Sequence, residues 1–272
     1  MKKCAYIHFK PKNKNALGDD ATTNLEVKIN DTVIEKVTEA KFLGVIIDEK
    51  LTWSAHINYL CKKIKCCTGV LNRIKDSIPE KFHKDLYHTL FESHLRYGIT
   101  VWGGVSLNKL LPLFVIQKRC VRILFGDRES YLDKFNTAVR VRPFGEQKLG
   151  IEFYTKEHSK PLFNKLELLT VHNLYLYHCL VEAFKILKFR TPISLYSQFN
   201  RSCRKETLLI SPEFSQSFIY RSTFQWNMIR QKLVINDFAH NLNAFKTSLS
   251  KLLMNTQKWG KFDEWIDQNY KL

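Results

Sequence analysis

A long helical stripe is the feature that most constrains the fold of this chain. From Trp53 onward, apolar side chains recur at spacings of three and four residues over about six helical turns. This spacing places them on one face of an α-helix, which has to be buried against other elements. Pro79 follows the pattern, so we expect the helix to end before it. The stripe consists of Ile57, Leu60, Ile64, Cys67, Leu71 and Ile74.

The segment before this helix predicts β-strands. Cys4–Phe9 is a short run of strand-forming residues. Residues 25–37 alternate apolar and polar side chains around Asn30-Asp31, which predicts a hairpin with a two-residue turn. Phe42–Ile47 is a continuous apolar run, and it predicts a strand that is buried on both faces.

The rest of the chain predicts helices. Residues 171–189 are apolar nearly all round except for a narrow stripe of His178, Glu182 and Lys185, which is typical of a central, buried helix. We expect residues 127–160 to be a connector with short helices and residues 191–216 to be irregular. The fold class is therefore α+β and predominantly α-helical, with a small N-terminal antiparallel β-sheet. The other predicted helices cover residues 80–96, 107–125, 222–234 and 241–257. In the first of them we expect Phe82, Leu86, Leu90 and Leu95 to point inward.

The charge of the chain predicts a polyanionic partner. Among 272 residues, 43 are Lys or Arg and 26 are Asp or Glu, which gives a net charge of +17. Such an excess attracts nucleic acid or an anionic membrane surface. The longest apolar run, Leu110–Ile116, is far shorter than the roughly 20 residues that span a bilayer, so we expect nucleic acid and no membrane. Seven scattered cysteines are typical of reduced thiols in an intracellular protein, nuclear or cytoplasmic.

No residue set in the sequence predicts an active site. No Cys and His residues have the spacing of a zinc site, so we expect no structural metal and no cofactor in this chain. Gly18-Asp19-Asp20 resembles the metal-binding turn of polymerases, which has to be held between two buried strands. Its flanking residues are loop-like, so a solvated loop is the favoured interpretation. We therefore name no catalytic residue.

Basic residues gather on two of the predicted helices. In the second helix they are three and four residues apart and therefore share one face. Both sets are candidates for contacts with a phosphate backbone. The alternative is that they only solvate the outer faces of amphipathic helices, and the high net charge favours nucleic acid. The two sets are Lys62, Lys65 and Arg73, and Lys118, Arg119 and Arg122.

A series of short segments along the chain carries a family resemblance. The segments are Phe42–Asp48, Leu51–Trp53, His56–Ile57, Tyr97–Gly98, Val101–Gly103, Gln117–Arg119, Arg122–Ile123, Pro161–Phe163, Leu174–Tyr175, Trp226–Asn227 and Phe245–Lys246. In this order they resemble the part that follows the palm in jockey-like, non-LTR retrotransposon reverse transcriptases. Single segments are unspecific, whereas the ordered set is not.

The resemblance implies a division of the chain into three parts. Residues 1–52 would be residual palm and primer-grip strands, residues 53–104 a helical thumb, and residues 105–272 a C-terminal helical region. Phe42, Leu43 and Gly44 match the hairpin that positions the 3′ end of the primer, where glycine lets the backbone approach a nucleotide closely. The alternative for these three residues is ordinary strand core.

The resemblance also implies what the chain lacks. In this family the metal-binding Ala-Asp-Asp stretch precedes the strand that corresponds to Cys4–Phe9, so it would lie before Met1. Mg²⁺ is therefore expected only for the complete parent enzyme, and residues 1–272 alone are expected to be inactive as an RNA-directed DNA polymerase. The implied partners are RNA, DNA or a hybrid, together with the missing palm and fingers. The alternatives are a retained nucleic-acid-binding protein without polymerase chemistry and a helical scaffold without a selected function.

Overall fold

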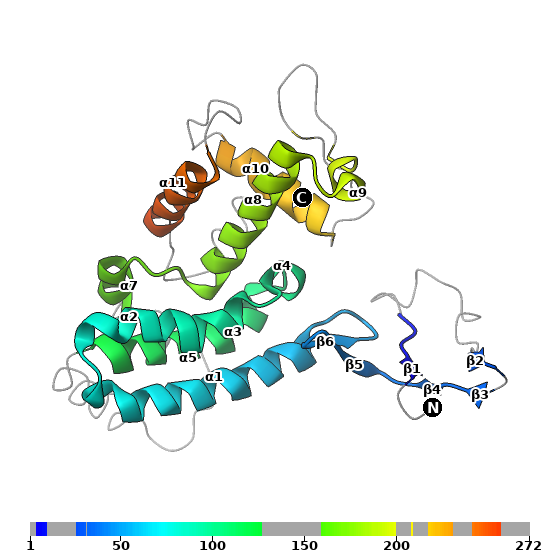
Figure 1. Cartoon of the computed structure of the whole chain (residues 1–272), viewed down its shortest axis with the longest axis horizontal. Coiled ribbons are helices and arrows are strands. Elements are labelled where there is room, and N and C mark those ends of the chain that lie inside the picture. The colour runs from blue at the N-terminus through cyan, green and yellow to red at the C-terminus, as the bar shows by residue number, and fades with distance from the viewer. Residues whose placement is uncertain are drawn as a thin grey trace, which may run out of the picture. The chain divides into compact units, whose positions relative to one another are not determined.

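The computed structural model describes residues 4–9, 26–30, 32–126, 159–199, 208, 217–230 and 241–256. The chain forms two compact units, Met1–Lys62 and Lys63–Leu272. Within the described residues the structure is mainly helical, with small sheets near the N-terminus, which confirms the expected α+β class (Figure 1). The division into parts at residues 52 and 104 stays a prediction, and Gly18-Asp19-Asp20 lies outside the described residues.

Three two-stranded sheets make up the described β-structure of the first unit. Two of them are antiparallel, as expected, whereas the strand nearest the N-terminus pairs in parallel. Ile29 pairs with Thr32, which confirms the predicted hairpin and its two-residue connection. The pairs are β1 (Ala5–Tyr6) with β4 (Glu35–Lys36), β2 (Lys28–Ile29) with β3 (Thr32–Val33), and β5 (Glu39–Phe42) with β6 (Val45–Asp48).

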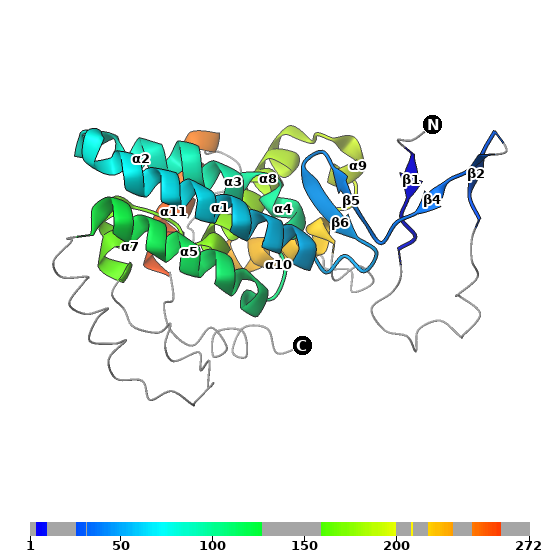
Figure 2. The ribbon, with the colours of Figure 1, turned by 90° about the horizontal axis from the view of Figure 1, so that it is seen from below.

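The apolar run Phe42–Ile47 is not one buried strand, and that prediction was wrong. The chain reverses at Leu43-Gly44, whose φ angles of 46° and 83° are both positive, as in the two-residue turns that join antiparallel strands. Phe42 and Leu43 are 64% and 74% exposed. Apolar residues on both sides of the turn, and in it, made two strands look like one. Figure 2 shows the resulting β5–β6 hairpin.

Helix α1 (Ser54–Ile74) follows the hairpin and confirms the helical stripe. Ile57, Leu60, Ile64 and Leu71 are buried, and the other two members of the stripe are half-buried. The helix passes into a short 3₁₀ turn, η3 (Lys75–Ser77), and ends before Pro79 as expected.

The helix predicted over residues 80–96 is a series of short helical elements with a π-helix in its middle. Of the residues expected to point inward, Leu95 is buried and Leu86 is half-buried, but Phe82 and Leu90 are exposed, so the prediction was wrong for these two. Buried residues recur every fourth position instead, at His83, Tyr87, Phe91 and Leu95, because the wider π-helical turn changes the register. The elements are η4 (Glu80–Phe82), α2 (His83–Leu86), η5 (Tyr87–Glu92) and α3 (Ser93–Arg96), and α4 (Ile99–Trp102) follows them.

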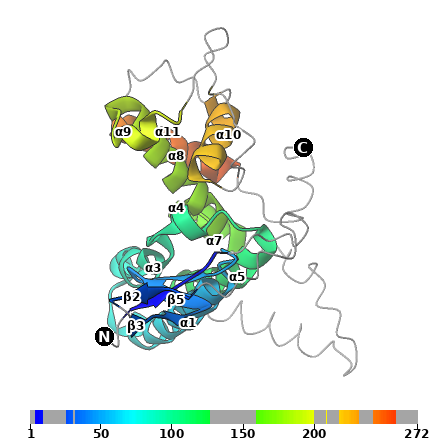
Figure 3. The same cartoon turned by 90° about the vertical axis from the view of Figure 1, so that its right-hand side faces the viewer.

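Helix α8 (Val171–Phe189) is central to the second unit and mostly buried, as predicted. Helices α5, α10 and α11 pack against it, and Figures 1 and 3 show α10 and α11 beside it. Phe184 of α8 stacks on Phe245 of α11 with ring centroids 4.3 Å apart. The remaining described helices are α5 (Leu107–Phe125), α7 (Lys160–Leu166), α9 (Ile193–Tyr196), α10 (Phe218–Arg230) and α11 (Leu242–Asn255).

Two further expectations concern the connecting segments and the membrane. Residues 127–158, predicted as a connector, lie outside the described residues, as do most of residues 200–216. None of the helices that the structure describes has the length and apolar character needed to cross a bilayer.

Candidate nucleic-acid interface

Asp48 fixes the start of α1. Its Oδ1 accepts hydrogen bonds from the backbone N–H groups of Thr52 (2.9 Å) and Lys50 (3.2 Å), and its Oδ2 accepts one from Trp53 (2.8 Å). Burial raises the pKa of this carboxyl, but the hydrogen bonds outweigh burial and hold the pKa below its usual value. One side chain at the end of β6 thus orders the turn that leads into the helix.

The β5–β6 hairpin is held to the first turns of α1 within the first unit. The backbone N–H of Ile46 donates to Nδ1 of His56 at 3.3 Å, and burial lowers the pKa of His56 to about 4, so the ring is a neutral acceptor. Nζ of Lys41 lies 5.0 Å from the centroid of the Tyr59 ring. These contacts leave the hairpin tip, with the candidate residues Phe42, Leu43 and Gly44, exposed.

The outer face of α1 carries the first basic set. Lys62, Lys65 and Arg73 are all exposed. A rotation of about 100° per residue places Lys65 and Arg73 within roughly 60° of Lys62 around the helix axis. Gly69 lies between them on the same stripe, and a Cβ added there would meet nothing within 4 Å. Because α1 contains no Asp or Glu, this stripe is basic, open and free of acidic neighbours on its own helix.

The second basic set is placed differently, because its three side chains are not equally exposed. Lys118 is only 5% exposed. Burial, and then the charge of Arg122, lower the pKa of Lys118 to about 8, and its Nζ lies 4.7 Å from the centroid of the Phe114 ring. Arg122 is half-buried, and its Nε donates to Oγ of Ser159 at 3.2 Å. Arg119 alone of the three is fully exposed.

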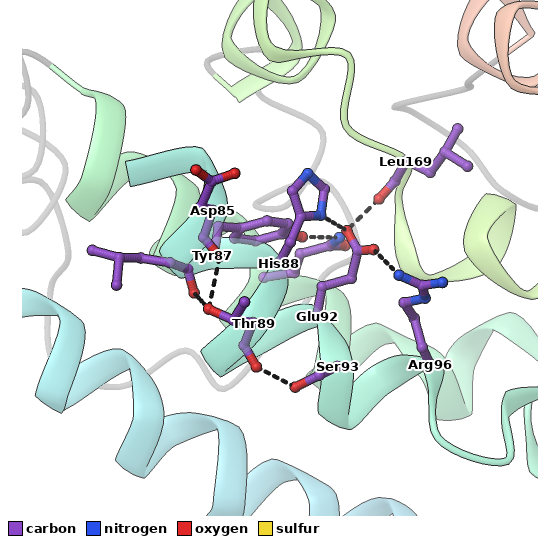
Figure 4. Close-up of polar contacts among 10 residues, drawn as sticks. Asp85, Tyr87, His88, Thr89, Glu92, Ser93, Arg96 and Leu169 are labelled. Carbon is purple, nitrogen blue, oxygen red and sulfur yellow. Dashed lines mark hydrogen bonds and ion pairs between the residues drawn. The ribbon is translucent and has the colours of Figure 1, made fainter. Parts of the chain in front are cut away.

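Gln117, which precedes this set, belongs to the core of the second unit. Its Nε2 donates to Oη of Tyr87 and to the carbonyl oxygen of Leu169, both at 2.8 Å, and its Oε1 accepts from the backbone N–H of Val171 at 3.0 Å. Figure 4 shows Tyr87 and Leu169 in this network. One fully buried amide therefore joins η5, α5 and the start of α8. Nothing in the residues around Gln117 predicts this role.

A polar row on η5 and α3 lies next to this network. The buried carboxylate of Glu92 forms a hydrogen bond with Nδ1 of His88 at 3.1 Å and an ion pair with Nη1 of Arg96 at 3.9 Å (Figure 4). The three residues are spaced four apart and form one helical face. Within the described parts of the chain, no group of three or more His, Cys, Asp or Glu side chains has a geometry that suits a metal ion.

Several segments that carry the resemblance meet in the second unit. A Cβ added at Gly103 would lie 2.5 Å from the Ile99 carbonyl oxygen and 2.7 Å from Cδ2 of Tyr175, so close packing against α8 requires glycine there. The side-chain amide of Asn227 pairs with both backbone groups of Leu208, at 3.0 Å and 2.8 Å. Small and polar residues in these segments thus serve tertiary packing.

Comparison with known proteins finds three mobile-element polymerases. The chain is 30% identical over 129 residues to the RNA-directed DNA polymerase from mobile element jockey of Drosophila funebris. The aligned residues cover 46% of the chain and 13% of that protein. It is 24% identical over 105 residues to the probable RNA-directed DNA polymerase from transposon X-element of Drosophila melanogaster, covering 37% of the chain and 11% of that protein. The corresponding polymerase from transposon BS is 22% identical over 102 residues, covering 36% and 11%.

These matches span only a small part of each relative, between 11% and 13% of its length. No family model matches the chain, and no solved structure matches it. The three similarities agree with one another in the kind of protein they find. They support a relationship of this chain to the reverse transcriptases of mobile elements.

Proposed function

We propose that the chain is a piece of a mobile-element RNA-directed DNA polymerase in which α1 holds template–primer nucleic acid by its phosphate backbone. The similar proteins carry that activity in their names, and the chain has a net charge of +17. The observation that carries the proposal is the exposed stripe of Lys62, Lys65 and Arg73 on a helix without any carboxylate.

The electrostatics of α1 favour an anionic ligand. Basic residues three or four apart on a helix repel one another, and acidic residues at the same spacing commonly offset that cost. On α1 no such residue is present, and Lys63 adds a further exposed cation beside the stripe. A polyanion lowers this repulsion and releases its own counterions when it binds. A phosphate backbone would therefore supply the negative charge that α1 lacks in its own sequence.

Gly69 supports a close approach of the ligand. Glycine inside a helix costs about 0.5–1 kcal/mol relative to alanine. No neighbouring atom requires the absence of a side chain there, since a Cβ would meet nothing within 4 Å. Close approach of a nucleic-acid strand to the helix backbone at this point would explain why residue 69 is glycine.

The β5–β6 hairpin fits the same proposal as the primer grip of the parent enzyme. Its tip exposes Phe42 and Leu43 beside a glycine, so that apolar surface and backbone are both available to a nucleotide or to the remainder of a polymerase. In this proposal the thumb begins with α1, and the catalytic carboxylates with their Mg²⁺ ions come from the rest of the parent enzyme.

The salt dependence of binding tests the proposal. We expect replacement of Lys62, Lys65 and Arg73 together by Gln to lower the slope of log K against log salt for an RNA–DNA duplex by about 2–3, from roughly 0.9 per phosphate contact. The matched control replaces Lys81, Lys165 and Lys251 by Gln, which removes the same charge from other exposed positions. Fluorescence anisotropy over a range of salt concentrations measures both.

The control variant should keep nearly the full slope of the wild type. Gln has a helix propensity close to that of Lys, so circular dichroism should be the same for all three proteins. Equal losses of slope in the two variants would show a diffuse charge effect and no interface on α1. Failure of the wild type to bind RNA, DNA or hybrid at low salt would favour the helical scaffold.

A further inference from the structure

The side chain of Arg221, on α10, lies directly on the turn that follows α4. A Cβ added at Gly104 would overlap Nη1 of Arg221 and would lie 2.8 Å from Oη of Tyr175. Gly104 therefore has to be glycine for the guanidinium to occupy this position. The guanidinium carbon is 5.8 Å from the centroid of the Tyr175 ring, a distance at which cation–π attraction acts.

No described residue balances the positive charge of this guanidinium. Among the described residues, no carboxylate forms an ion pair with Arg221, and Glu182 is paired with Lys185 at 2.7 Å. The ionisable groups nearest to Arg221 are neutral, because burial raises the pKa of the Tyr175 phenol above its usual value and that of the Cys179 thiol to about 12. A half-buried charge normally has a partner of opposite sign.

Three buried polar atoms around this position also make no hydrogen bond of normal geometry to a described residue. They are Nε of Arg221, Oη of Tyr175 and Oε1 of Gln225. Gln225 and Cys179 lie close enough to the Tyr175 hydroxyl to influence its pKa, but neither contact has normal hydrogen-bond geometry. Tyr175 and Gln225 are only 3% and 8% exposed. Polar atoms buried to this degree are nearly always bonded in folded proteins, to protein groups or to a bound ion or water. Their convergence on one guanidinium indicates a ligand.

The chemistry of these groups selects an oxyanion. The guanidinium presents several N–H donors in a planar fork, and the neutral phenol presents an O–H donor. A half-turn of the Gln225 amide exchanges its oxygen for an NH₂ group, which donates as well. Phosphate oxygens accept several such bonds at once. Arg221 and Gly104 keep part of their surface in solvent, so an oxyanion can reach the guanidinium. The polar atoms of Tyr175 and Gln225 are covered, so their bonds to the oxyanion require a small movement of these side chains.

We infer that Arg221, Tyr175 and Gln225 form an oxyanion site that receives one phosphate group of the nucleic-acid backbone. The nucleic-acid part of this inference rests on the function proposed above, whereas the binding of an oxyanion does not. The site lies wholly within the second unit and uses residues of the α4–α5 connection, α8 and α10. It is separate from the basic stripe on α1.

Replacement of Arg221 by Gln in the full chain tests the inference with two measurements. Inorganic phosphate, compared with sodium chloride at equal ionic strength, should raise the melting temperature of the wild type and not that of the variant. The slope of log K against log salt for a mixed-sequence RNA–DNA duplex should fall by about 0.7–0.9, the value of one phosphate contact.

Arg190→Gln is the matched control. Arg190 is exposed, and its guanidinium lies 5.8 Å from the centroid of the Tyr196 ring, so this variant removes the same charge and the same kind of ring contact elsewhere. It should keep both the phosphate effect and the slope. If Arg221→Gln does not fold, Gln225→Leu tests the site without changing its charge and should reduce the phosphate effect.

The outcomes separate this site from the proposed function. A phosphate effect that persists in the folded Arg221→Gln variant, or that is absent from the wild type, overturns the oxyanion site. A phosphate effect lost without any change of slope overturns the nucleic-acid part alone. If the α1 variant loses slope and Arg221→Gln keeps it, the site fails as a nucleic-acid contact while the function proposed for α1 stands.

Discussion

The basic sets on α1 and α5 are alike in sequence and opposite in the structure. Each has three cations at helical spacing beside an apolar stripe. On α1 all three side chains are exposed, whereas on α5 Lys118 is buried, Arg122 is half-buried and bonded to Ser159, and only Arg119 is exposed. Equal charge patterns thus produce one candidate interface and one packed helix.

The difference follows from how many neighbours each helix has. Within the second unit, α5 packs against α7, α8 and η5, so that the side of the helix that sequence periodicity marks as polar is covered. The buried lysine is tolerated because its stem packs among apolar residues and its ammonium lies over the Phe114 ring. Sequence periodicity identifies one buried face of a helix. It does not show whether further helices cover the remaining faces.

Loss of the Gln117 amide should have the largest effect on stability. We expect Gln117→Leu to destabilise the second unit by about 3–5 kcal/mol, because the Val171 N–H and the Leu169 carbonyl oxygen would stay buried without a partner. Urea denaturation measures this. Gln198→Leu is the control, since Gln198 donates to the Ser194 carbonyl oxygen at an exposed position and should cost less than about 1 kcal/mol. Similar small losses in both would mean that α5 is not packed as described.

Replacement of Lys118 should remove a pH dependence of stability. Lys118→Met keeps the length of the side chain and removes the buried ammonium, so the variant should lack the pH dependence of stability that this group gives to the wild type. The pKa of Lys118 is about 8 in the folded state, below its usual 10.5, so the unfolded state binds more protons between these values. Wild-type stability should therefore rise relative to the variant from pH 8 to pH 10.5.

Denaturation at pH 7 and at pH 10 decides this prediction. The stability of Lys118→Met relative to the wild type should be higher at pH 7 than at pH 10. Lys165→Met, at an exposed position, should show no such dependence. Equal relative stabilities at pH 7 and pH 10 would place Lys118 on an open surface, contrary to its burial on α5.

The smallest expected effect concerns Gly69 on α1. Gly69→Ala should stabilise the protein by about 0.5–1 kcal/mol, since the added methyl group meets no atom and alanine favours the helix. The same change should weaken duplex binding if a backbone approaches there. Gly103→Ala is the contrast, because its Cβ would lie 2.5 Å from the Ile99 carbonyl oxygen and should destabilise. Tighter duplex binding by Gly69→Ala would remove the argument for close approach.

The sequence predicted the parts of the fold that depend on local patterns. The stripe on α1, the hairpin at Asn30 and the buried character of α8 all follow from periodicity and turn chemistry, and the structure has them. The reversal at Leu43-Gly44 was missed because apolar residues flank and occupy the turn. The inward face of residues 80–96 was wrong because periodicity assumes an α-helix, and Tyr87–Glu92 forms a π-helix.

The candidate sites depend on contacts between distant residues, which one sequence does not reveal. Gln117 bonds to residues 30 to 54 positions away, and nothing in its neighbours marks it as a core residue. In the sequence nothing distinguishes Arg221 from the other basic residues, and only the structure shows that it lies against Gly104. Asp48 offered a local signal, since a carboxylate a few residues before a helix often bonds to free backbone N–H groups.

The two basic sets themselves provide the most direct test of the account. The measurement is the salt dependence of RNA–DNA duplex binding for two triple variants, one with Gln at Lys62, Lys65 and Arg73 and one with Gln at Lys118, Arg119 and Arg122. We expect the first to lower the slope by about 2–3 and the second by at most about 1, because Arg119 alone is open to a phosphate. An equal or larger loss in a folded second variant would contradict the assignment of the interface to α1.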